Sequence, residues 1–136
     1  MSSASADRAE ARLTIRSDPR ELRVVRQTLK EFFTVHGISS QLCDDLILVA
    51  NELTTNAIEA SALGADVTVL VTIDASRITL TVDNVGSQFE LPPEVELPRS
   101  SRLRGRGLAL THRIVDELFT ERLADGTRVI ARCTRT

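Results

Sequence analysis

Hydrophobic residues recur with helical spacing in two long segments of the first half of the chain. In each segment they return every three or four positions, which places them on one face of a helix. The first predicted helix opens at Asp18, as its N-cap, and ends at Gly37; the second begins at Ser39 or Ser40 and ends near Gly64. The two stripes are Leu22, Val25, Leu29, Phe32 and His36, and then Leu42, Leu46, Val49, Leu53, Ala57 and Ala60.

Alternating apolar and polar residues predict five strands. The predicted strands are residues 11–16, 67–73, 78–82, 119–123 and 127–133. Turns at Asp74-Ala75-Ser76 and Asp125-Gly126 join the last four into two hairpins, and a third helix is predicted from about Gly107 to Glu117. The stretch from Gly86 to Arg104 contains three prolines and is a candidate lid.

The order of these elements keeps helices and hairpins apart, which favours an α/β fold. We expect a two-layer sandwich with a mixed, mainly antiparallel sheet and helices on one face. Residues 1–10 are predicted to be a flexible tail and residues 11–136 to form a single domain.

Composition narrows the function classes. Of 136 residues, 42% are hydrophobic and 26% charged, as in soluble globular proteins, and no apolar run is long enough to span a membrane. Without a signal-like leader, the chain is expected in the cytoplasm. A net charge of -2 and only four aromatic residues argue against direct nucleic-acid binding. Cys43 and Cys133 lack metal-ligand spacing and are predicted to be core residues.

Three short patterns carry candidate chemistry. Glu52 and Asn56 share one helix face, and a carboxylate with an amide oxygen suits a hydrated Mg²⁺. Arg104 to Leu108 is a glycine-containing turn before a helix, which suits phosphate. Asn84, in register with the apolar residues of its strand, could accept a hydrogen bond from an adenine amino group. Each pattern alone also has a purely structural explanation: a hydrogen-bonded boundary pair, a flexible loop and a strand exit.

Together and in this order, the patterns resemble the GHKL ATPases, which include gyrase and histidine kinases. Glu52-Leu53-Thr54-Thr55-Asn56-Ala57 resembles their N-box, Asn84 to Phe89 and Gly105 to Leu108 resemble their two glycine boxes, and Gly126-Thr127 resembles their late strand motif. The run from Gly105 to Glu117 is most similar to that of bacterial anti-sigma serine kinases. The resemblance covers essentially Leu13 to Arg132 and implies a Bergerat-type ATP-binding fold.

The resemblance implies a role for each matched residue. It implies that Glu52 is the general base, that Asn56 coordinates Mg²⁺ at the phosphates, and that Thr127 helps to hold adenine. The implied ATP-binding positions are Asn56, Ala60, Asn84, Gly86, Arg104, Gly105, Arg106, Gly107, Leu108, Ala109 and Thr127. The implied partners are a sigma factor and a STAS-type anti-anti-sigma protein, with a possible homodimer.

Two positions depart from the family pattern. Asn84 stands where the first glycine box normally begins with Asp, and Gln88 replaces its second glycine. A neutral acceptor makes a weaker hydrogen bond than a charged one, which predicts about tenfold weaker ATP binding.

Three functions remain open at this point. The first is an ATP-dependent serine kinase that sequesters a sigma factor, and the second is an adaptor that keeps the fold but acts by docking. The third is a detached histidine-kinase catalytic domain, which the lack of a preceding dimerisation helix disfavours. Arg20, Arg23, Arg26 and Lys30 on the first helix form either a basic surface for an acidic partner or a solvated face.

Overall fold

The computed structural model describes residues 8–86 and 109–135, which contain a five-stranded sheet. The strands are β1 (Ala9–Arg16), β2 (Asp66–Ile73), β3 (Arg77–Val85), β4 (Glu117–Leu123) and β5 (Gly126–Thr134). Their order in the sheet is β1-β2-β3-β5-β4, and every neighbouring pair is antiparallel. The two predicted hairpins are therefore confirmed, and the sheet of the described residues is antiparallel rather than mixed.

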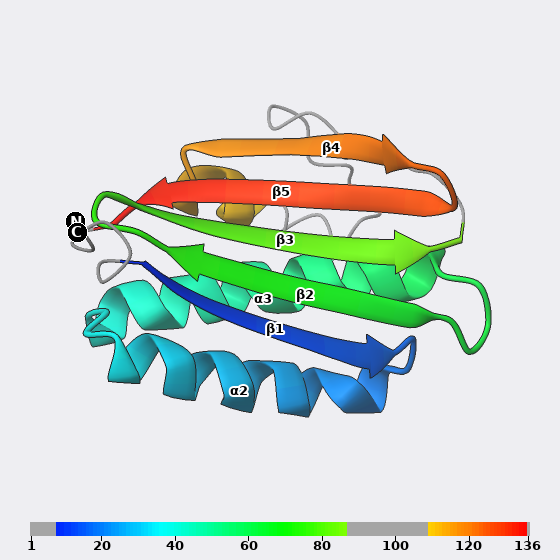
Figure 1. Cartoon of the computed structure of the whole chain (residues 1–136), viewed down its shortest axis with the longest axis horizontal. Coiled ribbons are helices and arrows are strands. Elements are labelled where there is room, and N and C mark those ends of the chain that lie inside the picture. Colours follow the sequence, from blue (N-terminus) through cyan, green and yellow to red (C-terminus); the bar gives the residue numbers. More distant parts are fainter. Residues whose placement is uncertain (1–7, 87–108, 136) are drawn as a thin grey trace.

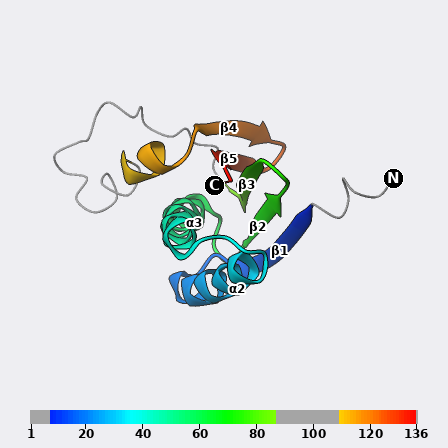
Figure 2. The ribbon, with the colours of Figure 1, turned by 90° about the vertical axis from the view of Figure 1, so that its left-hand side faces the viewer.

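The helices pack on one face of this sheet, as the segregation of helices and hairpins predicted (Figures 1 and 2). A short 3-10 turn, η1 (Pro19–Glu21), leads into α2 (Leu22–Val35), and α3 (Ser40–Ala60) follows. Side-chain caps begin both segments: Asp18 accepts a hydrogen bond from the N–H of Arg20, and Ser39 accepts one from the N–H of Leu42. The two predicted helices are thus confirmed, although α3 ends at Ala60, before Gly64.

The third predicted helix is shorter than the sequence indicated. Residues 109–114 are helical, whereas Glu117 already begins β4. Hydrogen bonds to β5 account for the early end: the N–H of Asp116 donates to the carbonyl of Arg132 (2.8 Å), and its carboxylate accepts from the N–H of Thr134 (2.9 Å). The predicted start at Gly107 lies outside the described residues.

The core lies between α3 and the inward face of the sheet. Figure 2 shows α3 flanked by α2 on one side and by residues 109–114 on the other. Phe32 packs against the core as predicted but is only partly buried, whereas its neighbour Phe33, which the stripe did not include, is 1% exposed. Cys43 and Cys133 are free and buried, as predicted, and burial raises the pKa of Cys133 to about 11.

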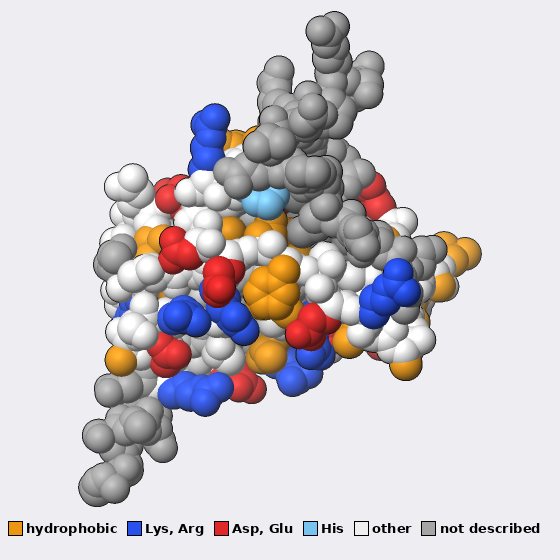
Figure 3. Space-filling model, turned by 90° about the horizontal axis from the view of Figure 1, so that it is seen from above, with side chains coloured by type: hydrophobic (Ala, Val, Ile, Leu, Met, Phe, Trp, Pro, Cys, Tyr) orange, Lys and Arg blue, Asp and Glu red, His pale blue; other side chains and the backbone are white. Residues whose placement is uncertain are grey.

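The outward face of the sheet carries ion pairs, and none of the described helices covers it. Arg128 donates to Asp83 (2.8 Å), and Arg132 reaches Glu117 (3.4 Å) while its guanidinium lies 5.3 Å from the centre of the Phe119 ring. Seen from above the β4 edge, charged and hydrophobic side chains are interspersed on the surface (Figure 3). Across the described parts of the chain, no helix has the length and apolar character needed to cross a membrane.

The two neighbouring phenylalanines provide a test of this packing. We expect Phe33→Ala to lower the free energy of unfolding by about 3–5 kcal/mol, because it empties a fully buried site. Phe32→Ala is the matched control and should cost clearly less, since its ring is partly exposed. Urea unfolding of both variants measures the difference, and equal losses would contradict the packing described.

Candidate functional site

Polar side chains interrupt the apolar core, and two of them, Asn84 and Thr127, lie at the end of the molecule where β3 ends and β5 begins. Among the described residues, five polar side chains are at least 94% buried. They are Thr54 and Asn56 of α3, Asn84 of β3, Thr111 of the helical residues 109–114, and Thr127 of β5. Burying polar groups is costly unless they are hydrogen-bonded, so a set of them within an apolar layer indicates a site.

Backbone hydrogen bonds hold three elements together at this end. The chain leaving α3 pairs with the end of β3 through the N–H of Ala62 and the carbonyl of Val85 (2.9 Å), and Ser61 and Gly86 form an antiparallel bridge. The N–H of Gly86 donates to the carbonyl of Asp125 (2.8 Å), in the turn between β4 and β5. The end of α3, the exit of β3 and the start of β5 are therefore fixed against one another.

Two glycines make this close approach possible. At Gly86, which has a φ of +153°, a Cβ atom would lie 2.5 Å from the carbonyl oxygen of Ala60. At Gly126, a Cβ atom would lie 1.9 Å from the carbonyl oxygen of Asn84. Any side chain at either position would push the elements apart. The predicted site positions Ala60, Asn84 and Gly86 are thus brought together with Gly126.

Asn84 is 1% exposed and has a fixed orientation. Its Oδ1 accepts a hydrogen bond of 2.7 Å from the backbone N–H of Thr127, its register partner on β5. This bond identifies the oxygen and leaves the amide Nδ2 on the other side, buried and without a hydrogen-bond acceptor among the described residues. The oxygen predicted to receive the adenine amino group therefore already accepts one hydrogen bond, and the atom of this amide that has no partner is a donor.

On α3, the predicted site residues follow one another at intervals of four. Glu52, Asn56 and Ala60 therefore lie on one face, each a helical turn from the next. Asn56 is 6% exposed, whereas Glu52 and Ala60, one turn to either side of it, are partly buried.

The remaining predicted site residues fall into two groups. Ala109 is helical and partly buried, whereas Arg104, Gly105, Arg106, Gly107 and Leu108 lie outside the described residues, as does most of the candidate lid. The sequence patterns did not single out Thr54 or Thr111, although both side chains are fully buried. The signal that could have found them is a threonine among the apolar residues of a helix, since β-branching makes threonine less favoured there than in strands.

The described residues fit the base end of a nucleotide. The Nδ2 donor of Asn84 is a buried polar atom that a purine acceptor would satisfy. Gly126 lets the backbones of β3 and β5 come close enough to hold that amide in place. For Mg²⁺, Asn56 offers an amide oxygen, and such an ion takes only one or two protein oxygens beside phosphates. Among the described residues there is no cluster of three or more His, Cys, Asp or Glu that would hold a metal alone.

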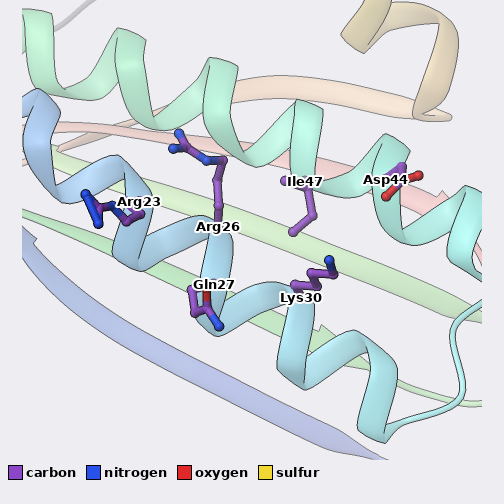
Figure 4. Close-up of a pocket in the computed structure, with 6 residues that line it drawn as sticks. All are labelled: Arg23, Arg26, Gln27, Lys30, Asp44 and Ile47. Atoms are coloured by element: carbon purple, nitrogen blue, oxygen red, sulfur yellow. The ribbon is translucent and has the colours of Figure 1, made fainter.

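A hollow lies on the outer side of the helices, between α2 and α3 (Figure 4). It has a volume of about 280 Å³ and is lined by Arg23, Arg26, Gln27, Lys30, Asp44 and Ile47. Arg26 is held in place by a hydrogen bond of 2.9 Å to Oδ1 of Asn51 on α3. We call this hollow the basic groove, because three cationic side chains line it against one anionic side chain.

Comparison with known proteins places the fold. The model of a family described as the histidine kinase-like ATPase domain matches residues 15–133. No curated protein sequence matches the chain.

Two solved structures share the fold. One is the crystal structure of the RsbU and RsbW domains of Rv1364c from Mycobacterium tuberculosis, with 19% identity, a TM-score of 0.71, and coverage of 93% of this chain. This chain spans only 32% of the length of that one. The other is the catalytic domain of the histidine kinase ThkA, with 18% identity, a TM-score of 0.55, and coverage of 93% of this chain and 98% of that one. At such identities the likeness concerns the fold alone, whereas the family match spans nearly all of the described residues: the chain belongs to the histidine kinase-like ATPase domain family.

Proposed function

We propose that the chain is an ATP-binding anti-sigma regulator that phosphorylates a serine or threonine of a STAS-type partner and binds a sigma factor. The observation that carries the proposal is the buried polar set on α3, β3 and β5, at the junction where an ATPase domain of this family would hold its nucleotide. The fold of an RsbW domain supports the anti-sigma role, as does the resemblance of the run from Gly105 to Glu117.

The roles of the α3 residues follow from their spacing. Asn56 would hold Mg²⁺, which neutralises phosphate charge when it is bound. Glu52 lies one turn earlier on the same face and is half-buried, so its carboxylate would receive the proton of the attacking hydroxyl. Phosphoryl transfer needs mainly positioning and charge neutralisation, which one carboxylate, one amide and backbone N–H groups can provide.

The second candidate is an adaptor that binds nucleotide and partners without transferring phosphate. The observation that favours it is the hydrogen bond between Asn84 and Thr127, which occupies the oxygen that would otherwise accept from adenine. Weakened nucleotide binding need not impair docking, so the two candidates differ in phosphoryl transfer and not in partner binding.

For either candidate, the basic groove is the surface we assign to an acidic partner. Arg23, Arg26 and Lys30 present positive charge along two turns of α2, and Ile47 supplies an apolar floor. Such a surface speeds encounter with a protein of opposite charge. The groove and the buried polar set are built from different residues, so partner binding and nucleotide binding can be tested separately.

The general base can be tested by exchanging one oxygen for nitrogen. We expect Glu52→Gln to lower transfer of labelled phosphate from ATP to the STAS-type partner by about 10²- to 10⁴-fold while ATP binding is retained. Glu59→Gln, an exposed carboxylate on the same helix, is the matched control and should transfer normally. Unchanged phosphate transfer by Glu52→Gln would exclude Glu52 as the general base. If the wild-type protein binds ATP but transfers no phosphate, the adaptor is the correct candidate.

The metal role of Asn56 predicts a Mg²⁺-dependent loss of affinity. Calorimetric titration with ATP should show at least about tenfold weaker binding for Asn56→Ala in the presence of Mg²⁺, and a smaller difference in its absence. Asn51→Ala removes an amide elsewhere on α3 and should bind ATP like the wild type. Equal losses with and without Mg²⁺ would show that Asn56 acts on packing alone.

Charge reversal tests the basic groove. The double variant Arg23→Glu/Lys30→Glu should bind the acidic partner at least about tenfold more weakly at low salt, with a smaller difference at high salt, and should bind ATP normally. Arg12→Glu, an exposed charge on β1, provides the control. Surface plasmon resonance at two salt concentrations measures the effect; partner binding that the double variant leaves unaltered would exclude the groove as the docking surface.

A further inference from the structure

The base end of the site presents a hydrogen-bond donor, and this determines which purine it accepts. Asn84 is the buried polar residue of β3 in that site, and within residues 8–86 and 109–135 its Nδ2 atom has no hydrogen-bond acceptor. The oxygen cannot exchange places with the nitrogen, because Oδ1 accepts from the N–H of Thr127 at 2.7 Å and a nitrogen there would oppose one donor to another. The polarity of the amide is therefore set by the β3–β5 ladder.

The two common purine types differ in what they offer to such a donor. A 6-aminopurine such as adenine presents a donor at position 6 and an acceptor at N1, whereas a 6-oxopurine presents an acceptor at position 6. An amino group that faces Nδ2 gives two opposed donors, while a 6-oxo group that faces Nδ2 gives a hydrogen bond. Adenine can pair with Asn84 in two ways: its N1 can accept from Nδ2, or its amino group can donate to Oδ1, which already accepts from Thr127.

We propose that Asn84 is a specificity-determining residue through which the site accepts 6-oxopurine nucleoside triphosphates as well as ATP. The inference rests on the proposed nucleotide-binding function and deepens it. A carboxylate at the same position would have one oxygen on the N–H of Thr127 and a second oxygen as an acceptor for an amino group. The exchange of a single atom at residue 84 thus reverses the preference for position 6 of the base.

The test compares ATP with inosine triphosphate, which differs from ATP at position 6 and in the protonation of N1. Calorimetric titration of the full chain in Mg²⁺ should give wild-type dissociation constants for the two nucleotides within about tenfold of each other. Asn84→Asp should shift the ratio of the two affinities in favour of ATP by roughly 10- to 100-fold. The reason is that a carboxylate attracts the 6-amino donor of adenine and repels the 6-oxo acceptor of inosine triphosphate. Nucleotide-induced shifts in melting temperature provide an independent readout.

The matched control is Asp83→Asn, the reverse exchange of carboxylate for amide at the neighbouring residue of β3. Asp83 points to the opposite face of the sheet and pairs with Arg128, so Asp83→Asn should leave the ratio of the two affinities unchanged. Circular dichroism establishes whether each variant is folded. If Asn84→Asp does not fold, the ratio of the wild-type affinities for ATP and inosine triphosphate decides whether the inference holds.

Three outcomes overturn the inference, and they are distinguishable. Wild-type protein that binds ATP more than about tenfold more tightly than inosine triphosphate contradicts the inference and leaves ATP binding intact. A folded Asn84→Asp variant with an unchanged ratio does the same. Failure of folded wild-type protein to bind either nucleotide removes the proposed function and this inference with it.

Discussion

The alternation of β3 is the constraint on which both the core and the candidate site depend. Its inward positions carry Ile78, Leu80 and Val82, each at most 3% exposed, and the next inward position is Asn84. A slip of one residue would turn the whole set to the outward face. The apolar packing that fixes the first three side chains therefore also fixes the amide, and hydrophobic burial supplies the free energy that holds a polar group in the layer beneath α3.

The outward face of the same strand repeats this register with charges. Asp83 pairs with Arg128 at 2.8 Å, directly beside the inward pair of Asn84 and Thr127. The Arg128 side chain is 40% exposed, and such pairs contribute about 1 kcal/mol or less. The ion pair is therefore consistent with the register but does not set it. The inward apolar residues and the hydrogen bonds of the ladder hold β3 in place.

Much of the fold could be predicted because helix faces and strand alternation are local properties. The limits are equally physical. Phe32 and Phe33 stand three and four positions after Leu29, and both spacings fit a helical stripe, so only tertiary packing decides which ring is buried. The end of the third helix depends on hydrogen bonds from Asp116 to β5, and the order β1-β2-β3-β5-β4 depends on pairings between distant segments.

The candidate site shows the same division. The sequence placed Asn84 on the inward face and Glu52 with Asn56 on one helix face, since both statements need only a local period. It could not show that Oδ1 of Asn84 receives a hydrogen bond from Thr127, because the two residues are 43 positions apart and meet only through the pairing of β3 with β5. That single contact converts the expected acceptor into a donor.

An amide at position 84 also has a consequence for stability without nucleotide. A buried donor that lacks an acceptor costs about 1–3 kcal/mol, whereas an ionised carboxylate buried without enough donors costs more. Either group would regain hydrogen bonds when a base binds beside it. Without a base, however, the buried amide costs the protein less free energy of folding than a buried carboxylate would. Asn84 therefore allows the junction of α3, β3 and β5 to stay closed on its own, while a nucleotide base can still satisfy the remaining donor.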